Sequence, residues 1–188
     1  MGKLEQNNGI YYEGSWENGQ LSGRGKLIQN GSIYEGEFKN NKQEGEGKEI
    51  WSDGSMYEGQ YKDGLKNGKG KFVYEDGSSY EGDFENNHMN GYGKYIFSDK
   101  RQYEGEWNNN KIDGKGKFEW PDGRIYEGEY KMDKKDGFGV FKWPDGRVYK
   151  GYWKNGKQEG EGEFYSPKTQ EWKKGKWENG KRILWYDK

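Results

Sequence analysis

Few residues in this 188-residue chain could carry out catalysis. His88 is the only histidine, cysteine is absent, and no serine stands in the Gly-x-Ser-x-Gly turn that exposes a nucleophile. His88 falls in a predicted turn, where a solvated side chain is the simpler interpretation. The 33 Asp and Glu residues leave a glycosidase-like pair of carboxylates as the one catalytic alternative. We therefore expect no enzymatic activity.

Glycine recurs in Gly-x-Gly pairs, from Gly23 and Gly25 to Gly160 and Gly162. A phosphate-binding loop would follow one strand and open a helix, whereas these pairs recur seven times inside predicted strands. We interpret them as packing glycines. Turns such as Asp122-Gly123 lack the alternating acidic ligands of a calcium loop. The sequence therefore predicts neither a metal site nor a cofactor.

A repeat of 22 or 23 residues runs through the chain. Each copy begins with a tyrosine, which we number position 0, and later positions are counted from it. Position 2 is glycine, position 4 is aromatic, and positions 11 and 13 are the Gly-x-Gly pair. An eighth, degenerate copy runs from Lys173 through Gly175 and Trp177. The seven tyrosines are Tyr12, Tyr34, Tyr57, Tyr80, Tyr103, Tyr126 and Tyr149.

Each copy predicts a β-hairpin, because its apolar residues alternate with a period of two and Asp-Gly or Pro-Asp-Gly favours a turn. Only 28% of residues are apolar but 18% are aromatic, so rings must supply most of the buried surface. We expect an all-β fold, an elongated and twisted single antiparallel sheet of about eight tandem hairpins. Residues 1–11 form a lead-in, 12–172 the seven copies, and 173–188 the degenerate copy with a C-terminal cap.

The motif Tyr-Glu-Gly-x-aromatic followed by Gly-x-Gly resembles the MORN repeat, over roughly residues 10–180. The resemblance implies a structural or adaptor role, since members built only of repeats are usually structural or adaptor parts, several of them in ciliary, axonemal or cytoskeletal assemblies in the cytoplasm. Many family copies carry histidine at position 10, and no role of that histidine transfers to this chain. Position 10 is here Ser22, Glu44, Asn67, Asn90, Asp113, Asp136 and Glu159.

Pairing the second strand of one hairpin with the first strand of the next predicts two different faces. Position 14 then lies opposite position 1 of the next copy, and position 12 opposite position 3. Cations thus meet anions, as in Lys71–Glu81 and Lys69–Asp83, and such cross-strand pairs are favourable. Positions 0, 4, 15 and 17 form an aromatic face, and we expect the glycine at position 11 to leave room for the ring at position 4 of the next copy. The opposite side is the charged face.

The charge pattern fails in the sixth copy, and there we predict a protein-binding surface. Position 12 is Phe138, opposite Tyr152, and position 14 is Val140, opposite Lys150. Tyr92 makes a smaller break in the fourth copy. Exposed aromatic clusters are typical anchors of interfaces. The alternative is that the sheet folds back and covers these side chains.

Position 17 supplies a row of rings that is the second candidate for partner binding. A partner helix could lay its apolar stripe along the row, or the rings could pack on one another as core. The sequence is compatible with both arrangements. The row consists of Trp51, Tyr74, Phe97, Trp120 and Trp143.

Charge limits the other classes of partner. The net charge is −1 and the strand lysines have acidic neighbours, so the basic face that nucleic acid requires is not expected. No stretch of about 18 apolar residues is present, which excludes a transmembrane helix. A basic cluster near the end could attract anionic phospholipid, at about 1 kcal/mol for each cation; a solvated cap is the simpler interpretation. The cluster comprises Lys173, Lys174, Lys176, Lys181 and Arg182.

The sequence therefore predicts a non-enzymatic scaffold or adaptor that binds other proteins in a larger assembly. One alternative is a peripheral membrane tether that binds anionic phospholipid through the basic cluster. The other is a regulatory module that binds a helix of an enzyme or motor.

Overall fold

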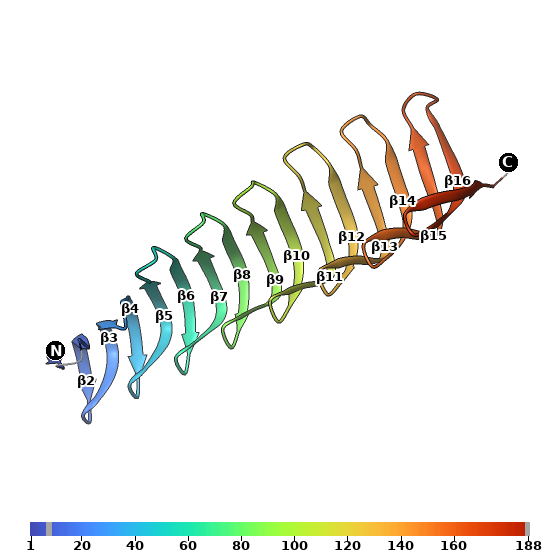
Figure 1. The fold of residues 1–188 in the computed structure, drawn as a ribbon. Helices are drawn as coiled ribbons and strands as arrows, with labels where there is room; N and C mark the ends of the chain where they lie inside the picture. Colours follow the sequence, from blue (N-terminus) through green and yellow to red (C-terminus); the bar gives the residue numbers. More distant parts are fainter. Residues whose placement is uncertain (7–8, 187–188) are drawn as a thin grey trace. The chain divides into compact units, whose positions relative to one another are not determined.

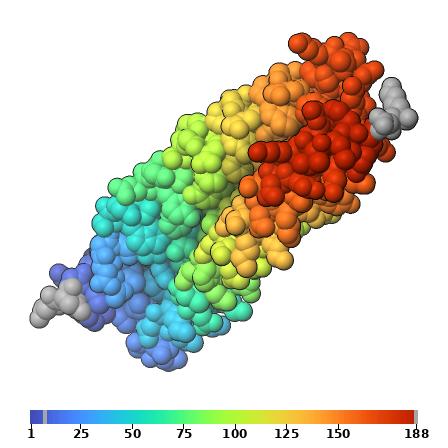
Figure 2. All heavy atoms as spheres, turned by 45° about the vertical axis from the view of Figure 1, so that its right-hand side comes forward, coloured from blue at the N-terminus to red at the C-terminus, as the bar shows by residue number. Residues whose placement is uncertain are grey.

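The computed structural model describes residues 1–6 and 9–186, which form strands and turns and contain no helix. The chain divides into two compact units, Met1–Ser98 and Asp99–Lys188, and each is described by itself. Within each unit every strand pairs antiparallel with the strand that follows it. Figure 1 shows this succession of hairpins, and Figure 2 shows their atoms following one another in the same order within each unit.

The prediction of an all-β fold built from tandem antiparallel hairpins is confirmed. The predicted lead-in also contributes a strand, since β1 pairs with β2. The first unit contains β1 (Gly2–Glu5), β2 (Tyr11–Glu17), β3 (Gln20–Gln29), β4 (Ser32–Lys39), β5 (Lys42–Ile50), β6 (Met56–Lys62), β7 (Leu65–Val73), β8 (Ser79–Glu85) and β9 (His88–Ile96). The second contains β10 (Gln102–Asn108), β11 (Lys111–Glu119), β12 (Ile125–Lys131), β13 (Lys134–Lys142), β14 (Val148–Lys154), β15 (Lys157–Ser166), β16 (Glu171–Glu178) and β17 (Lys181–Trp185).

A tight turn of two residues joins the two strands of each hairpin. Both turn residues have positive φ, for example 47° at Asn109 and 65° at Asn110. This is the backbone of a type I′ turn, whose twist matches that of the flanking strands, and asparagine and glycine adopt it at little cost. The connections from one hairpin to the next vary in length, with two residues after β3, five after β5 and four after β15.

Within each unit, tight turns are bonded to the hairpin before them. Asp133 donates its N–H to Ile112 O at 2.9 Å, and its Oδ1 accepts the Ile112 N–H at 2.8 Å. Position 10, which lacks the histidine expected from the family resemblance, also contributes: Glu44 Oε2 accepts the N–H of Asp63 at 2.9 Å. Backbone groups at the ends of the hairpins are thereby satisfied by the neighbouring copy.

The seven tyrosines at position 0 form the core, and each is at most 1% exposed. Each hydroxyl donates to the backbone carbonyl three residues later, as Tyr57 does to Gln60 O at 2.9 Å. The Tyr57 ring meets Tyr61 and Phe84 edge to face, with centroids 5.2 and 5.1 Å away. Such aromatic pairs are worth about 0.5–1.5 kcal/mol beyond the area they bury. Within each unit, the buried tyrosines thus connect one copy to the next through the rings at position 4.

The tyrosine ring explains why position 13 is glycine. A Cβ added at Gly70 would lie 2.6 Å from Cζ of Tyr57, which is well inside van der Waals contact. Across the strand pair Gly70 faces another glycine, Gly59, at position 2 of the same copy. The ring thus lies directly on bare backbone.

Position 11 is glycine for a reason other than the one predicted. Gly68 does lie opposite Phe84, but its φ is +96°, and an added Cβ would meet the side chain of Gln60, with Cδ at 3.1 Å. Gln60 Oε1 in turn accepts the N–H of Lys69 at 3.0 Å. Glycine is needed for the left-handed backbone and for this acceptor at position 3, not to make room for the next ring.

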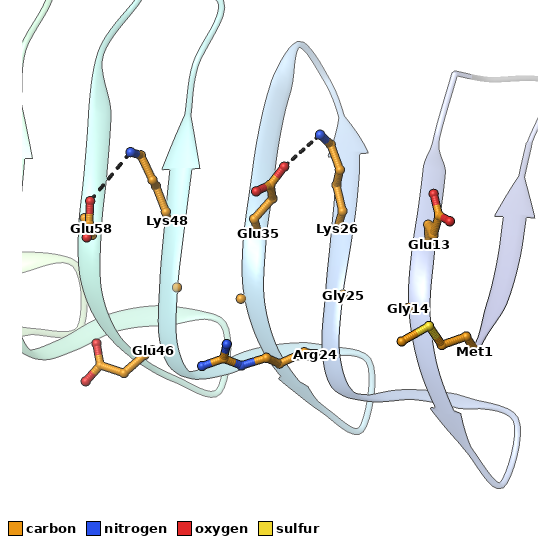
Figure 3. Close-up of a pocket in the computed structure, with 12 residues that line it drawn as sticks. Met1, Glu13, Gly14, Arg24, Gly25, Lys26, Glu35, Glu46, Lys48 and Glu58 are labelled. Carbon is orange, nitrogen blue, oxygen red and sulfur yellow. Dashed lines mark ion pairs between the residues drawn. The ribbon is translucent and has the colours of Figure 1, made fainter.

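The charged face has the predicted pairing. Lys71 lies opposite Glu81 and Lys69 opposite Asp83, with Nζ–O distances of 3.4 and 2.7 Å. Exposed ion pairs contribute at most about 1 kcal/mol each, so their main effect is on strand register. Figure 3 shows the same pairing between Lys26 and Glu35 and between Lys48 and Glu58.

We expect Tyr57→Phe to lower the free energy of unfolding by about 1–2 kcal/mol, because the Gln60 carbonyl would lose its donor in a buried site. Urea unfolding measures this change. Tyr152→Phe is the matched control, since Tyr152 is 56% exposed. This substitution should change the free energy of unfolding by no more than about 0.5 kcal/mol. Equal losses for the two variants would contradict the role given to the tyrosine hydroxyl.

Candidate functional site

An aromatic cluster, here called the outer patch, lies on the charged face of the second unit. It consists of Phe138 and Val140 from β13 and Tyr152 from β14. Phe138 lies opposite Tyr152 and Val140 opposite Lys150, as predicted. The two rings meet edge to face with centroids 5.5 Å apart, and Phe138 is 38% and Tyr152 56% exposed. Water therefore reaches aromatic surface at positions where Lys69 and Asp83 form an ion pair.

A pocket of about 420 Å³ opens beside the outer patch. Phe138 and Tyr186 provide its aromatic lining. The Tyr186 hydroxyl donates to Glu161 Oε1 at 3.2 Å, and its N–H donates to Lys174 O at 2.9 Å. The repeat spacing does not place Tyr186 beside Phe138, because Tyr186 follows the last strand of a degenerate copy. The remaining lining residues are Lys150, Gly151, Glu161, Gly162, Glu163 and Lys174.

The charged face of the first unit can be compared with the outer patch. It has a pocket of about 540 Å³ lined by charged side chains, Met1 and bare glycines (Figure 3). Tyr92, the smaller predicted break, is 53% exposed in this unit and donates its N–H to Asp83 Oδ2 at 3.0 Å. The charged side chains that line this first-unit pocket are Glu13, Arg24, Lys26, Glu35, Glu46, Lys48 and Glu58.

The row of rings at position 17 packs against the rings at position 15. The centroid of Trp120 lies 4.4 Å from that of Phe118 and 5.7 Å from that of Phe141. All five members are half-buried. Each ring of the row is thus less exposed than Phe138 or Tyr152. Its other members, Trp51, Tyr74, Phe97 and Trp143, have similar ring contacts.

Two lysines at position 9 reach into the aromatic face, which sequence reasoning missed. Nζ of Lys135 lies 4.6–5.1 Å from the centroids of four rings, and Lys66 lies over three. Burial lowers the pKa of Lys135 to about 8 and also lowers the pKa of Lys66. The available signal was that position 9 is apolar in three copies, at Leu21, Met89 and Ile112. The rings around Lys135 are Trp120, Tyr126, Phe141 and Trp153.

The predicted phospholipid-binding cluster is divided between the two faces of the second unit. Lys174 and Lys176 lie on the charged face, and each is ion-paired with a glutamate. Lys173 lies on the aromatic face, and the Arg182 guanidinium stands 4.4 Å from the centroid of the Trp185 ring. The cluster therefore presents no single basic surface. All five members, Lys173, Lys174, Lys176, Lys181 and Arg182, are exposed.

The candidates for catalysis are dispersed. His88 begins β9, is exposed, and lies opposite Glu85. Within residues 1–6 and 9–186, no group of three or more His, Asp or Glu side chains is placed to hold a metal ion. The same residues contain no helix long and apolar enough to cross a bilayer.

The sequence matches the MORN repeat family model seven times, at residues 12–33, 34–56, 57–79, 80–100, 103–123, 126–146 and 149–169. The chain belongs to the MORN-repeat family. The seven matched MORN repeats correspond to the seven copies that begin with a buried tyrosine. No curated protein matches the sequence significantly.

Among solved structures, the MORN-repeat chain resembles the TCP domain of SAS-4 (dCPAP) of Drosophila melanogaster, determined in complex with a proline-rich motif of Ana2 (dSTIL). The TM-score is 0.51 at 11% identity, and the match covers 92% of this chain and 86% of that one. The wild-type TCP10 domain of Danio rerio CPAP and a point mutant match at 17% and 18% identity with TM-scores of 0.29 and 0.32. These two matches cover 99% and 100% of both chains. The likeness to the Drosophila domain concerns the fold alone.

We expect the stability difference between wild type and Lys135→Met to depend on pH. The pKa of Lys135 is about 8 in the folded chain, against an ordinary value of 10.5, so the unfolded chain binds more protons between these values. Wild type should therefore gain up to about 3 kcal/mol as pH rises through this window, and the methionine variant should not.

Urea unfolding at about pH 7 and about pH 10 measures this difference. Lys134→Met is the control, because Lys134 is exposed beside the tight turn. A difference between wild type and Lys135→Met that stays constant with pH would contradict the burial of the ammonium.

Proposed function

We propose that this MORN-repeat chain is a non-enzymatic scaffold subunit whose outer patch binds a proline-rich segment of another protein. The observation that carries the proposal is the exposed edge-to-face pair of Phe138 and Tyr152, at positions where Lys69 and Asp83 form an ion pair. Exposed aromatic side chains beside a pocket are the usual anchors of protein interfaces.

The chemistry of the patch favours proline over other apolar segments. A polyproline II segment presents pyrrolidine rings and free carbonyls, and it loses little entropy on binding to an aromatic-lined groove. Phe138, Tyr152 and Tyr186 supply exposed ring surface, while Lys150 and Lys174 line the pocket and offer donors to carbonyls. The complex of the Drosophila domain with a proline-rich motif supports this choice of ligand.

We expect a fluorescently labelled decaproline peptide to bind the chain, and the double variant Phe138→Lys, Tyr152→Glu to bind it about tenfold or more weakly. Fluorescence anisotropy measures both affinities. The double variant recreates the ion pair that Lys69 and Asp83 form at the same positions, so the fold should persist, and circular dichroism checks that it does. Equal binding by the variant, or no binding by wild type, would sink the proposal.

Two further ligands separate the alternatives in the same assay series. A helical alanine-rich peptide tests the interpretation that the row of rings binds a helix. Vesicles with and without anionic phospholipid test the membrane tether, for which Lys173→Glu with Lys181→Glu is the diagnostic variant. Preference for either ligand over decaproline would argue against a proline-rich partner.

For the setting we propose a ciliary or cytoskeletal assembly in the cytoplasm, supported by the membership of this chain in the MORN-repeat family, several members of which belong to such assemblies. A fluorescent fusion of the full chain should co-localise with axonemal or cytoskeletal filaments in ciliated cells. The outer-patch double variant should become diffuse. Diffuse fluorescence of the wild type would overturn the setting while leaving the peptide-binding result intact.

A further inference from the structure

A pocket of about 530 Å³ lies on the aromatic face of the first unit. Its lining includes Tyr34, Phe38, Gln43, Glu49 and Trp51. Glu49 occupies position 15, where no other copy has a charged residue. A carboxylate therefore stands where most copies place a ring, and we call this space the Glu49 pocket. Position 15 is elsewhere Leu27, Phe72, Tyr95, Phe118, Phe141 and Phe164.

Glu49 is half-buried among rings and brings a negative charge to this space. Its Oε2 accepts the hydroxyl of Tyr61 at 3.1 Å. Burial raises the pKa of Tyr61, and Glu49 raises it further. Burial also raises the pKa of Tyr34, with smaller contributions from Glu37 and Glu49. A carboxylate in such surroundings is more stable when a cation joins it.

The chain itself shows which cation such a space accommodates. In the sixth copy the ammonium of Lys135, at position 9, lies among four aromatic rings. In the third copy Lys66 occupies the equivalent place. In the second copy position 9 is the uncharged Gln43. Ammonium groups are attracted to aromatic faces, so this pocket has the rings and an anion but no lysine of its own at position 9.

The two lysines nearest to the pocket have other contacts. Nζ of Lys66 lies 4.8 Å from the centroid of Trp51, and burial lowers its pKa although Glu49 opposes this effect. Lys42 at the rim is ion-paired with Asp63 at 3.4 Å. Lys66 therefore balances part of the Glu49 charge from the neighbouring cage, and a variant at Lys66 separates the two roles of Glu49.

We infer that the Glu49 pocket binds the side chain of a lysine presented by a partner protein, with Glu49 as the anion and Tyr34 and Trp51 as ring walls. This site is in the first unit and uses none of the residues of the outer patch. It rests on the proposed function only in that its occupant comes from another protein. A lysine is favoured over an apolar side chain because the pocket carries a carboxylate among its rings.

The test is an NMR titration of the isotopically labelled full chain with N-acetyl-lysine-N-methylamide. We expect saturable shifts of the Trp51 indole N–H and the Tyr34 ring, with a dissociation constant of about 1 mM. Glu49→Gln should weaken binding about tenfold, because a charge-assisted contact is lost. The norleucine analogue, which lacks the ammonium, should cause no saturable shift. Equal shifts with norleucine, or unchanged binding by Glu49→Gln, would overturn the inference.

Two variants complete the design. Lys66→Met removes the neighbouring cation, so it should tighten lysine binding if Glu49 serves the pocket, and a weakened response would mean that Glu49 only supports Lys66. The outer-patch double variant should bind the lysine probe as wild type does. A chain that fails with decaproline but binds the lysine probe would overturn the proposed function and leave this inference standing.

Discussion

The structure depends on one hydrogen bond that is repeated in each of the seven copies that begin with tyrosine. It runs from the buried tyrosine hydroxyl to the backbone carbonyl three residues later, as from Tyr57 to Gln60. To reach that carbonyl the ring must lie flat on the backbone of the paired strands, which is possible only where Gly59 and Gly70 carry no side chain. In the same geometry the ring at position 4 lies on the same face as the tyrosine. The charged residues at positions 1, 3, 12 and 14 lie on the opposite face. The division into an aromatic and a charged face thus follows from the placement of one phenol group.

The functional candidates are departures from the repeat, not parts of it. The backbone is held by tyrosines, glycines and turn-to-turn bonds, so a few exposed positions can change without loss of the fold. Phe138 and Tyr152 turn an ion-pair site into an aromatic surface, and Glu49 turns a ring position into an acidic pocket. Lys66 and Lys135 show a third kind of change, in which a cation enters the aromatic face.

Much of the fold and part of the candidate site could be predicted from the sequence, because the repeat fixes both strand parity and pairing. The opposition of Lys71 to Glu81 and of Phe138 to Tyr152 follows from counting residues. Side-chain direction beyond the register could not be predicted. Lys117 lies opposite Glu127, yet its Nζ bonds to Glu119 at 2.7 Å, since both carboxylates are within reach of a flexible chain.

Other features depended on backbone geometry that spacing does not reveal. The glycine at position 11 was predicted to make room for a ring. Glycine is instead required there by the positive φ of the backbone at a strand irregularity, as at Gly68. Tyr186 joins the pocket beside Phe138 only because β17 returns along β16. The burial of Lys135 was hidden because lysine at a single position in a charged sequence resembles a solvated residue.

The two ends of each hairpin differ in how well they tolerate inserted residues, whether these arise in evolution or in the laboratory. At one end every turn has the same two-residue length. Where a turn is bonded to the copy before it, as Asp133 is to Ile112, an added residue would break contacts in two copies at once. At the other end the linkers already range from two residues after β3 to five after β5. That side can accept a foreign loop, an epitope or a whole inserted domain while the stack of strands stays in register.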